Sequence, residues 1–288
     1  MTSTDTFDPV AFKDAQRSEW QIAAQGWRKW YDVLEADIAG QVVSQKLVDL
    51  ANVGPGDTVL DIASGYGEPA LTSARAVLPG GHVTSTDIAA DLLAFGKERA
   101  LSAGLDNVEF LESDAEALRF ADATFDAVLS RQGLQFLPDV VGTLHRLHSA
   151  LKRHGRLAAA VWGPQDRVQF AIPIPIIVAE FGLPPPPSGR PGPFALADPG
   201  ELAQLVAGAG FREVVTGSVT VIYETASPED CTQWIRDVAP PLANLTKGQP
   251  PEIAEEVWRK VTDAWAPLMT SDGRVRTSNQ ALWVAATK

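Results

Sequence analysis

The chain has 288 residues, of which 45% are hydrophobic, and a formal net charge of −12. This length suits one large α/β domain with an appendage, and the negative charge argues against a surface that binds nucleic acid or anionic lipid. The single cysteine, Cys231, excludes an internal disulfide and a cysteine metal site, and we expect no metal centre. No apolar run is long enough to span a bilayer, and residues 1–9 lack the pattern of a secretory signal, so we expect a cytoplasmic protein.

The first 50 residues are predicted to be helical. No proline occurs from Phe12 to Leu50, and Trp20, Trp27, Trp30 and Tyr31 fall at spacings that can share a helix face. Such a stripe packs on the rest of the protein or covers a bound ligand, and both interpretations stay open.

Strands and helices alternate over the next hundred residues. We predict strands at 58–63, 83–88, 108–113, 125–130 and 156–162, and helices at 91–103 and 139–151, the last followed by a cationic turn at 152–155. Strand–helix alternation with short connections indicates a doubly wound, mostly parallel α/β sheet. Right-handed crossovers then place the carboxyl ends of the strands on one edge.

The composition changes after Gly163. Prolines between 164 and 193 leave little room for continuous helix, whereas Asp198 is a good cap for a helix that ends at Gly210. A long strand at 211–223, a helical stretch at 227–269 and a last strand at 281–287 follow. The predicted divisions are an N-terminal helical segment at 1–50, a core at 51–163, a proline-rich lid insertion at 164–197, a continuation of the core at 198–225, a helical lid insertion at 226–270 and a closing strand of the core at 271–288.

A glycine turn lies between the first strand and the helix after it. Its residues Gly65-x-Gly67-x-x-Ala70 fit the dinucleotide fingerprint, with Asp87 placed about 20 residues later to bind ribose hydroxyls. Asp61, inside the strand, instead suits the cationic amino group of a methionine moiety. Asp114, after the third strand, could accept a hydrogen bond from an adenine amino group. These acids favour a ligand that carries an amino acid and a nucleoside.

Several ordered motifs resemble one enzyme family. Asp61-Ile62-Ala63-Ser64-Gly65-Tyr66-Gly67 resembles motif I of class I methyltransferases dependent on S-adenosylmethionine (SAM), although the family often has glycine in place of Ala63. Thr86-Asp87-Ile88, Glu112-Ser113-Asp114-Ala115, Phe125-Asp126-Ala127-Val128 and the block from Leu151 to Gly155 resemble its later motifs. Over residues 50–165 the chain is similar to the type related to ubiquinone and menaquinone biosynthesis enzymes.

This resemblance implies a Rossmann-like, seven-stranded, mostly parallel sheet with helical lid insertions and SAM as the cofactor. The cofactor-binding residues that it implies are Asp61, Ala63, Ser64, Gly65, Gly67, Asp87, Ile88, Ser113, Asp114, Ala115, Arg131 and Gln132. The candidate substrate-binding residues are Tyr31, Gln132, Phe136 and Trp162.

The expected activity is methyl transfer to a small, partly apolar acceptor, such as an aromatic or polyketide-like metabolite. An NAD-dependent oxidoreductase, or a SAM-binding protein that acts on a protein partner, stays an alternative. No histidine is expected near the strand ends that form the site. The candidates for a base from the lid are Glu180, Tyr223 and Asp237.

Overall fold

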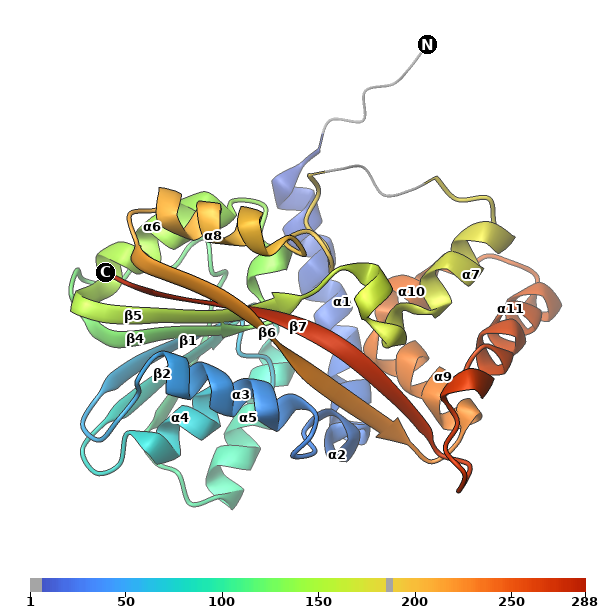
Figure 1. Ribbon diagram of the computed structural model, residues 1–288, viewed down its shortest axis with the longest axis horizontal. Helices are drawn as coiled ribbons and strands as arrows, with labels where there is room; N and C mark the ends of the chain where they lie inside the picture. The colour runs from blue at the N-terminus through green and yellow to red at the C-terminus, as the bar shows by residue number, and fades with distance from the viewer. Residues whose placement is uncertain (1–6, 185–188) are drawn as a thin grey trace, which may run out of the picture.

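The computed structural model describes residues 7–184 and 189–288, and within them seven strands form one sheet in the order β3-β2-β1-β4-β5-β7-β6 (Figure 1). The strands are β1 (Thr58–Ile62), β2 (His82–Asp87), β3 (Val108–Glu112), β4 (Phe125–Arg131), β5 (Leu151–Trp162), β6 (Arg212–Thr225) and β7 (Val275–Thr287). β1 to β5 pair in parallel, and β7 is antiparallel to both β5 and β6. The predicted doubly wound, mostly parallel sheet is confirmed.

Helices cover both faces of the sheet. On one face lie α3 (Gly40–Leu50), α4 (Ala70–Ala76) and α5 (Ala90–Ser102), and on the other lie α6 (Val140–Ala150) and α8 (Pro199–Gly208) (Figure 1). Two buried apolar clusters fill the spaces between the helices and the sheet. β1 is buried from Val59 to Ile62, as expected for a central strand of a sheet covered on both faces.

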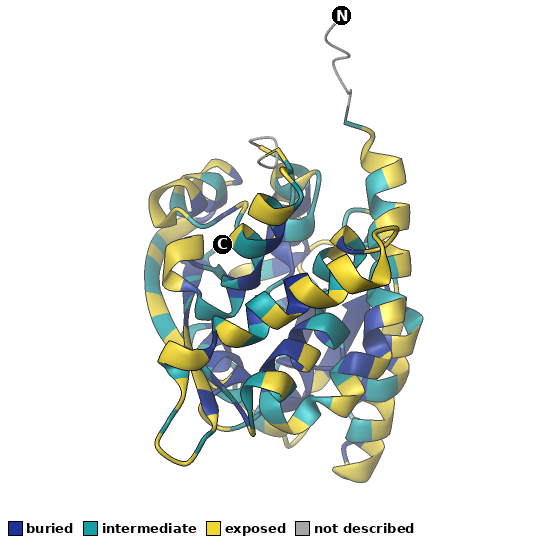
Figure 2. Ribbon diagram, turned by 90° about the vertical axis from the view of Figure 1, so that its right-hand side faces the viewer, coloured by how far each residue is buried: buried dark blue, intermediate teal, exposed yellow. Residues whose placement is uncertain are grey.

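The remaining helices are α1 (Pro9–Lys29), α2 (Tyr31–Leu34), α7 (Pro173–Glu180), α9 (Pro228–Val238), α10 (Pro240–Leu245) and α11 (Pro251–Asp263). Of these, α7, α9, α10 and α11 gather on the right of Figure 1, beside the far ends of β6 and β7, whereas α1 and α2 lie near the middle of the view. Short 3-10 turns occur at Leu134–Phe136, Gln165–Arg167, Gln169–Ala171 and Ala266–Leu268. Figure 2 shows this side, with exposed residues on the outward turns of the helices and buried ones toward the interior. No helix in the described ranges is long and apolar enough to cross a membrane.

The N-terminal segment is helical but broken twice. α1 ends at Lys29, and residues 35–39 separate α2 from α3. The chain turns tightly at Gly40, where an added Cβ would lie 2.2 Å from a carboxylate oxygen of Glu35 and 2.5 Å from the carbonyl oxygen of Leu34. This break brings the Glu35 side chain into the interior, which the absence of proline in the segment did not predict.

Two strands are longer than predicted. β5 begins at Leu151, opposite Phe125 of β4, so the predicted cationic turn at 152–155 is wrong: these residues form an irregular part of the strand. β7 begins at Val275 rather than at the predicted residue 281. The prediction missed this part of the strand because Thr277 and Asn279 are polar but buried, which hides the alternation of apolar and polar residues expected of a strand.

The proline-rich stretch holds a helix, contrary to the expectation of little room for one. Pro173 and Pro175 lie in the first turn of α7, where backbone N–H groups have no partner within the helix, so proline is tolerated there. Residues 185–187 of the proline run at 184–187 lie outside the described residues. Residues 1–6 of the N-terminal stretch that was searched for a secretory signal also lie outside them. Asp198 accepts a hydrogen bond from the backbone of Glu201, which confirms the predicted cap of α8.

Candidate functional site

A cavity of about 620 Å³ lies at the carboxyl edge of the sheet. Its walls come from the ends of β1 to β6, from α1 and from the helices α7, α9 and α10. The predicted site residues that line it are Ala63, Ser64, Gly65, Asp87, Ile88, Ser113, Asp114, Ala115, Arg131, Gln132, Phe136 and Trp162. The sheet order divides the cavity into a β1–β3 side and a β5–β6 side, with the end of β4 between them.

The β1–β3 side is built around the glycine turn and Asp87. The carboxylate of Asp87 accepts hydrogen bonds from the backbone N–H of Gly65 and of Ala89, each at 2.8 Å. Burial raises the pKa of Asp87 to about 6, and these backbone donors oppose the rise. Gly65 has a φ of +56°, and an added Cβ would meet no atom within 4 Å. The turn therefore leaves an open space beside a buried carboxylate.

Asp61 is fully buried in β1, and neither of its carboxylate oxygens has a hydrogen-bond partner among the described residues. It does not line the cavity itself. Burial raises its pKa well above the usual value, although the nearby backbone N–H of Ala70 and the charge of Arg131 oppose this. A buried carboxylate without a partner is costly, so the position favours a cationic ligand group that would compensate it.

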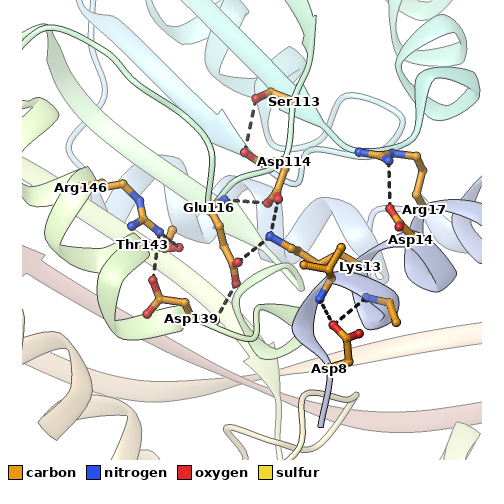
Figure 3. A network of polar contacts seen from close by, with 12 residues as sticks. Asp8, Lys13, Asp14, Arg17, Ser113, Asp114, Glu116, Asp139, Thr143 and Arg146 are labelled. Atoms are coloured by element: carbon orange, nitrogen blue, oxygen red, sulfur yellow. Dashed lines mark hydrogen bonds and ion pairs between the residues drawn. The ribbon is translucent and has the colours of Figure 1, made fainter.

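Asp114, at the end of β3, is already engaged by α1. Lys13 of α1 lies 2.7 Å from Asp114 and 2.9 Å from Glu116, and Figure 3 shows its ammonium between the two carboxylates. The other oxygen of Asp114 accepts a hydrogen bond from the backbone N–H of Glu116. The helix α1 is thus attached to the loop after β3 across the mouth of the β1–β3 side.

Between the two sides lies a buried polar group made by Arg131, Glu35 and Tyr66. Arg131 of β4 donates to Glu35 at 2.6 Å and to the hydroxyl of Tyr66 at 2.8 Å, and Tyr66 in turn donates to Glu35. A second guanidinium nitrogen of Arg131 donates to the carbonyl of Gly40. Arg131 therefore lines the cavity while pairing with an acid of the N-terminal segment.

The backbone at the end of β4 approaches the glycine turn closely. An added Cβ on Gly133 would lie 2.6 Å from the Cβ of Ala63. Ala63 and Gln132 both have positive φ values, +52° and +62°, a conformation that is uncommon outside glycine. The alanine in place of the family's glycine is therefore accommodated because the facing residue has no side chain. The side-chain amide nitrogen of Gln132 is buried without a hydrogen-bond partner in the described chain.

The β5–β6 side is aromatic. Trp162 and Phe170 lie edge to face with ring centroids 4.8 Å apart, and the rings of Tyr223 and Trp234 lie 4.9 Å apart. Asn279 of β7 accepts a hydrogen bond from the backbone N–H of Phe170 at 2.9 Å and so fixes that ring's place. Of these residues only Trp162 was predicted as a substrate contact.

Tyr31 does not line the cavity. Its hydroxyl accepts a hydrogen bond from Arg99, and its ring packs against Tyr66 and Phe95. Gly67 is also absent from the wall and continues the turn behind it. Trp20 and Trp27 of the same aromatic stripe do line the cavity, and Trp20 packs against Phe136 at 5.4 Å between ring centroids.

The candidate bases differ in their surroundings. Asp237 pairs with Lys29, and Glu180 pairs with Lys260, and neither acid lines the cavity. Tyr223 does line it, but burial raises its pKa above the usual value for tyrosine, which opposes a role as a base at neutral pH. No histidine in the described chain lines the cavity.

Sequence reasoning missed several lining residues that come from distant segments: Lys13, Glu35, Tyr66, Phe170 and Trp234. Tyr66 lies inside the glycine motif and was available as a signal. The others carry no local pattern, because they reach the cavity only when the N-terminal segment and the elements after β5 pack over the sheet edge.

Part of the chain is similar to known methyltransferases. Residues 59–155 match the family model of a methyltransferase domain. The ubiquinone/menaquinone biosynthesis C-methyltransferase UbiE of Brucella anthropi is 42% identical over 153 residues, which are 53% of this chain and 54% of that protein. A demethylmenaquinone methyltransferase of Listeria monocytogenes is 34% identical over 114 residues, 40% of this chain and 48% of that protein. The chain thus spans about half the length of the curated relatives that it matches.

Solved structures share the fold over a greater part of the chain. A phosphoethanolamine N-methyltransferase 2 of Haemonchus contortus, in complex with S-adenosyl-L-methionine, has a TM-score of 0.58 and 17% identity, and the match covers 99% of this chain and 60% of that one. At this identity the likeness concerns the fold alone. Residues 59–155 therefore match a methyltransferase domain, within a fold that solved methyltransferases share, and about half of the chain is similar to a ubiquinone/menaquinone biosynthesis C-methyltransferase.

Proposed function

We propose that the protein transfers a methyl group from SAM to a small, partly apolar acceptor, such as an aromatic or polyketide-like metabolite. The observation that carries this proposal is the contact of Asp87 with the N–H of Gly65, 2.8 Å long, at the wall of a cavity that continues to an aromatic end. The carboxylate of Asp87 would accept hydrogen bonds from the ribose hydroxyls, and the open space at Gly65 would let the cofactor approach the backbone. Asp61 would compensate the cationic amino group.

The same site disfavours a dinucleotide. Asp87 suits the ribose of either ligand and Glu68 pairs with Arg99, but Asp61 lies directly before the glycine turn, where its ionised form would repel a pyrophosphate. The sheet order also differs from the 3-2-1-4-5-6 order of dinucleotide-binding folds, since antiparallel β7 lies between β5 and β6.

SAM, when bound, supplies a methyl group on an activated sulfonium, so transfer needs alignment of the acceptor and exclusion of water. The chain supplies both requirements: the helices α1, α7, α9 and α10 contribute walls that shield the cavity, and its aromatic end would hold the acceptor. Lacking a histidine at the described part of the wall, the site suits an acceptor atom that needs no strong base. A cytoplasmic location stays a prediction.

Calorimetric titration with SAM, S-adenosylhomocysteine (SAH) and NADH tests the donor. We expect saturable binding of SAM and SAH and none of NADH; binding of NADH with SAM inert would reject the proposal. Formation of SAH with small aromatic acceptors then tests the transfer. Turnover with protein substrates alone would favour the alternative of a protein partner.

A further inference from the structure

The hydroxyl of Tyr223 is an unused hydrogen-bonding group in the wall of the β5–β6 side. Tyr223 belongs to β6, is 8% exposed and lines the cavity. Its hydroxyl has no hydrogen-bond partner among residues 7–184 and 189–288. Because a buried tyrosine usually finds a partner for its O–H, this group points to a ligand.

The surroundings fix the ring while leaving the oxygen available. The ring of Tyr223 packs against Trp234 at 4.9 Å and lies 6.3 Å from Trp162 and from Phe170, measured between ring centroids. The carbonyl of Tyr223 lies within 3.4 Å of the hydroxyl of Thr277 in β7. A ligand therefore meets a rigid aromatic wall that carries the hydroxyl of Tyr223 and the indole N–H of Trp234, which is buried without a partner in the described chain.

The charges near this oxygen are already compensated. Arg131 and Glu35 both influence the ionisation of Tyr223, and they pair with each other at 2.6 Å. Lys13, the other cation in the described wall, pairs with Asp114 and Glu116. No cation in this part of the chain is thus free to bind a carboxylate or phosphate of an acceptor. Burial keeps the phenol protonated at neutral pH, because it raises the pKa of Tyr223 above its usual range.

We propose that Tyr223 is a specificity-determining residue of the acceptor site, donating a hydrogen bond to an oxygen of an uncharged acceptor that contains a planar ring. This inference rests on the proposed function, because it assigns the β5–β6 side to the acceptor. The aromatic wall would hold the ring, and Tyr223 would select acceptors with an oxygen at one edge. Anionic acceptors would be excluded for lack of a free cation.

The test uses the full-length protein saturated with SAH and three probes of similar shape. These are 2-acetylnaphthalene, whose carbonyl can only accept, 2-ethylnaphthalene, which lacks the oxygen, and 2-naphthoate, which is anionic. Tryptophan fluorescence quenching gives the Kd of each probe in the native protein and in Tyr223→Phe, a variant that keeps the ring and removes the oxygen. The ratio of the ethyl to the acetyl Kd isolates the hydrogen bond.

We expect that ratio to fall by about three- to tenfold in Tyr223→Phe, as the loss of one neutral hydrogen bond predicts. The Kd for 2-ethylnaphthalene and the Kd for SAH should stay unchanged, and the latter also verifies that the variant folds. An unchanged ratio, tighter binding of 2-naphthoate than of 2-acetylnaphthalene, or no saturable binding of the neutral probes would each overturn the inference. Failure of the native protein to bind SAH would instead count against the proposed function.

Discussion

At the scale of single residues, the candidate site depends on where each carboxylate lies relative to water. Asp61 and Asp87 belong to neighbouring strands and both have a raised pKa, but only Asp87 faces the cavity, where its carboxylate accepts from the backbone N–H of Gly65. The two acids therefore differ in what they can offer a ligand. Asp87 can accept from hydroxyl groups, whereas Asp61 can contribute a negative charge from behind the wall once a cationic ligand group offsets the effect of its burial.

The raised pKa of Asp87 predicts that cofactor affinity depends on pH. Ribose hydroxyls donate to the ionised carboxylate, so binding of SAH should be strongest above the pKa of about 6 and should weaken by about tenfold for each unit below it. Asp87→Asn should weaken binding at pH 8 by about 1.5–3 kcal/mol and abolish this dependence. Titration calorimetry from pH 5 to pH 8 measures both.

The exposed Asp91, at the start of α5, provides the matched control for that experiment. Asp91→Asn should leave both the affinity and its pH profile unchanged. A profile in Asp87→Asn that still falls below pH 6 would show that another group controls binding.

At the scale of elements, the turn between β1 and α4 has to provide a backbone conformation and also leave space. Gly65 provides the backbone conformation through its φ of +56°. It also leaves space, because no atom would lie within 4 Å of an added Cβ. Elsewhere a glycine can serve the conformation alone. Gly104, which follows α5, has a φ of +68° and equally open surroundings, but it does not line the cavity.

This comparison predicts different outcomes for Gly65→Ala and Gly104→Ala. Each should lower the free energy of unfolding by about 1–2 kcal/mol, the cost of a left-handed conformation for a residue with a Cβ. Only Gly65→Ala should weaken SAH binding, by about tenfold or more, because its methyl group would occupy the space left for the cofactor. Urea denaturation and calorimetry test the pair, and equal affinities in the two variants would contradict the placement of the cofactor.

Sequence patterns predicted the elements of the core better than those of the lid. The central strand β1 is mostly apolar, and the cap of α8 is a local signal, so both could be predicted. The start of β7 was missed because the polar residues Thr277 and Asn279 are buried there, where their side chains bond to the facing strand β6. The helix α7 was missed because proline disfavours helix except in the first turn, and the sequence does not show where a turn begins.

At the scale of the whole molecule, the N-terminal segment is attached to the sheet through a buried ion pair. Glu35 and Arg131 are separated by 96 positions in the chain, and their side chains are 1% and 9% exposed. Tyr66 of the glycine turn shares the carboxylate of Glu35. The segment therefore contributes to the position of the turn as well as to the cover of the cavity.

Removing one partner of this pair should be costly. Arg131→Met leaves the Glu35 carboxylate buried without its partner, and we expect the free energy of unfolding to fall by about 3–5 kcal/mol. The double variant Glu35→Gln and Arg131→Met removes the uncompensated charge and should recover part of that loss. Urea denaturation measures both, and a loss below about 1 kcal/mol in Arg131→Met would show that the pair is not buried in solution.

The sequence by itself determined the fold class, the glycine turn and the acids at the ends of β1 to β3. Each of these depends on contiguous residues whose period, turn chemistry or place after a strand is local, and parallel topology brings strand ends together without further information. Only the tertiary structure decided that Lys13 forms an ion pair with Asp114 and that Glu35 forms one with Arg131. It also decided that Tyr223 faces the cavity with a hydroxyl that has no hydrogen-bond partner among the described residues. These arrangements join segments far apart in the chain, and no local pattern encodes which distant side chain fills a given space.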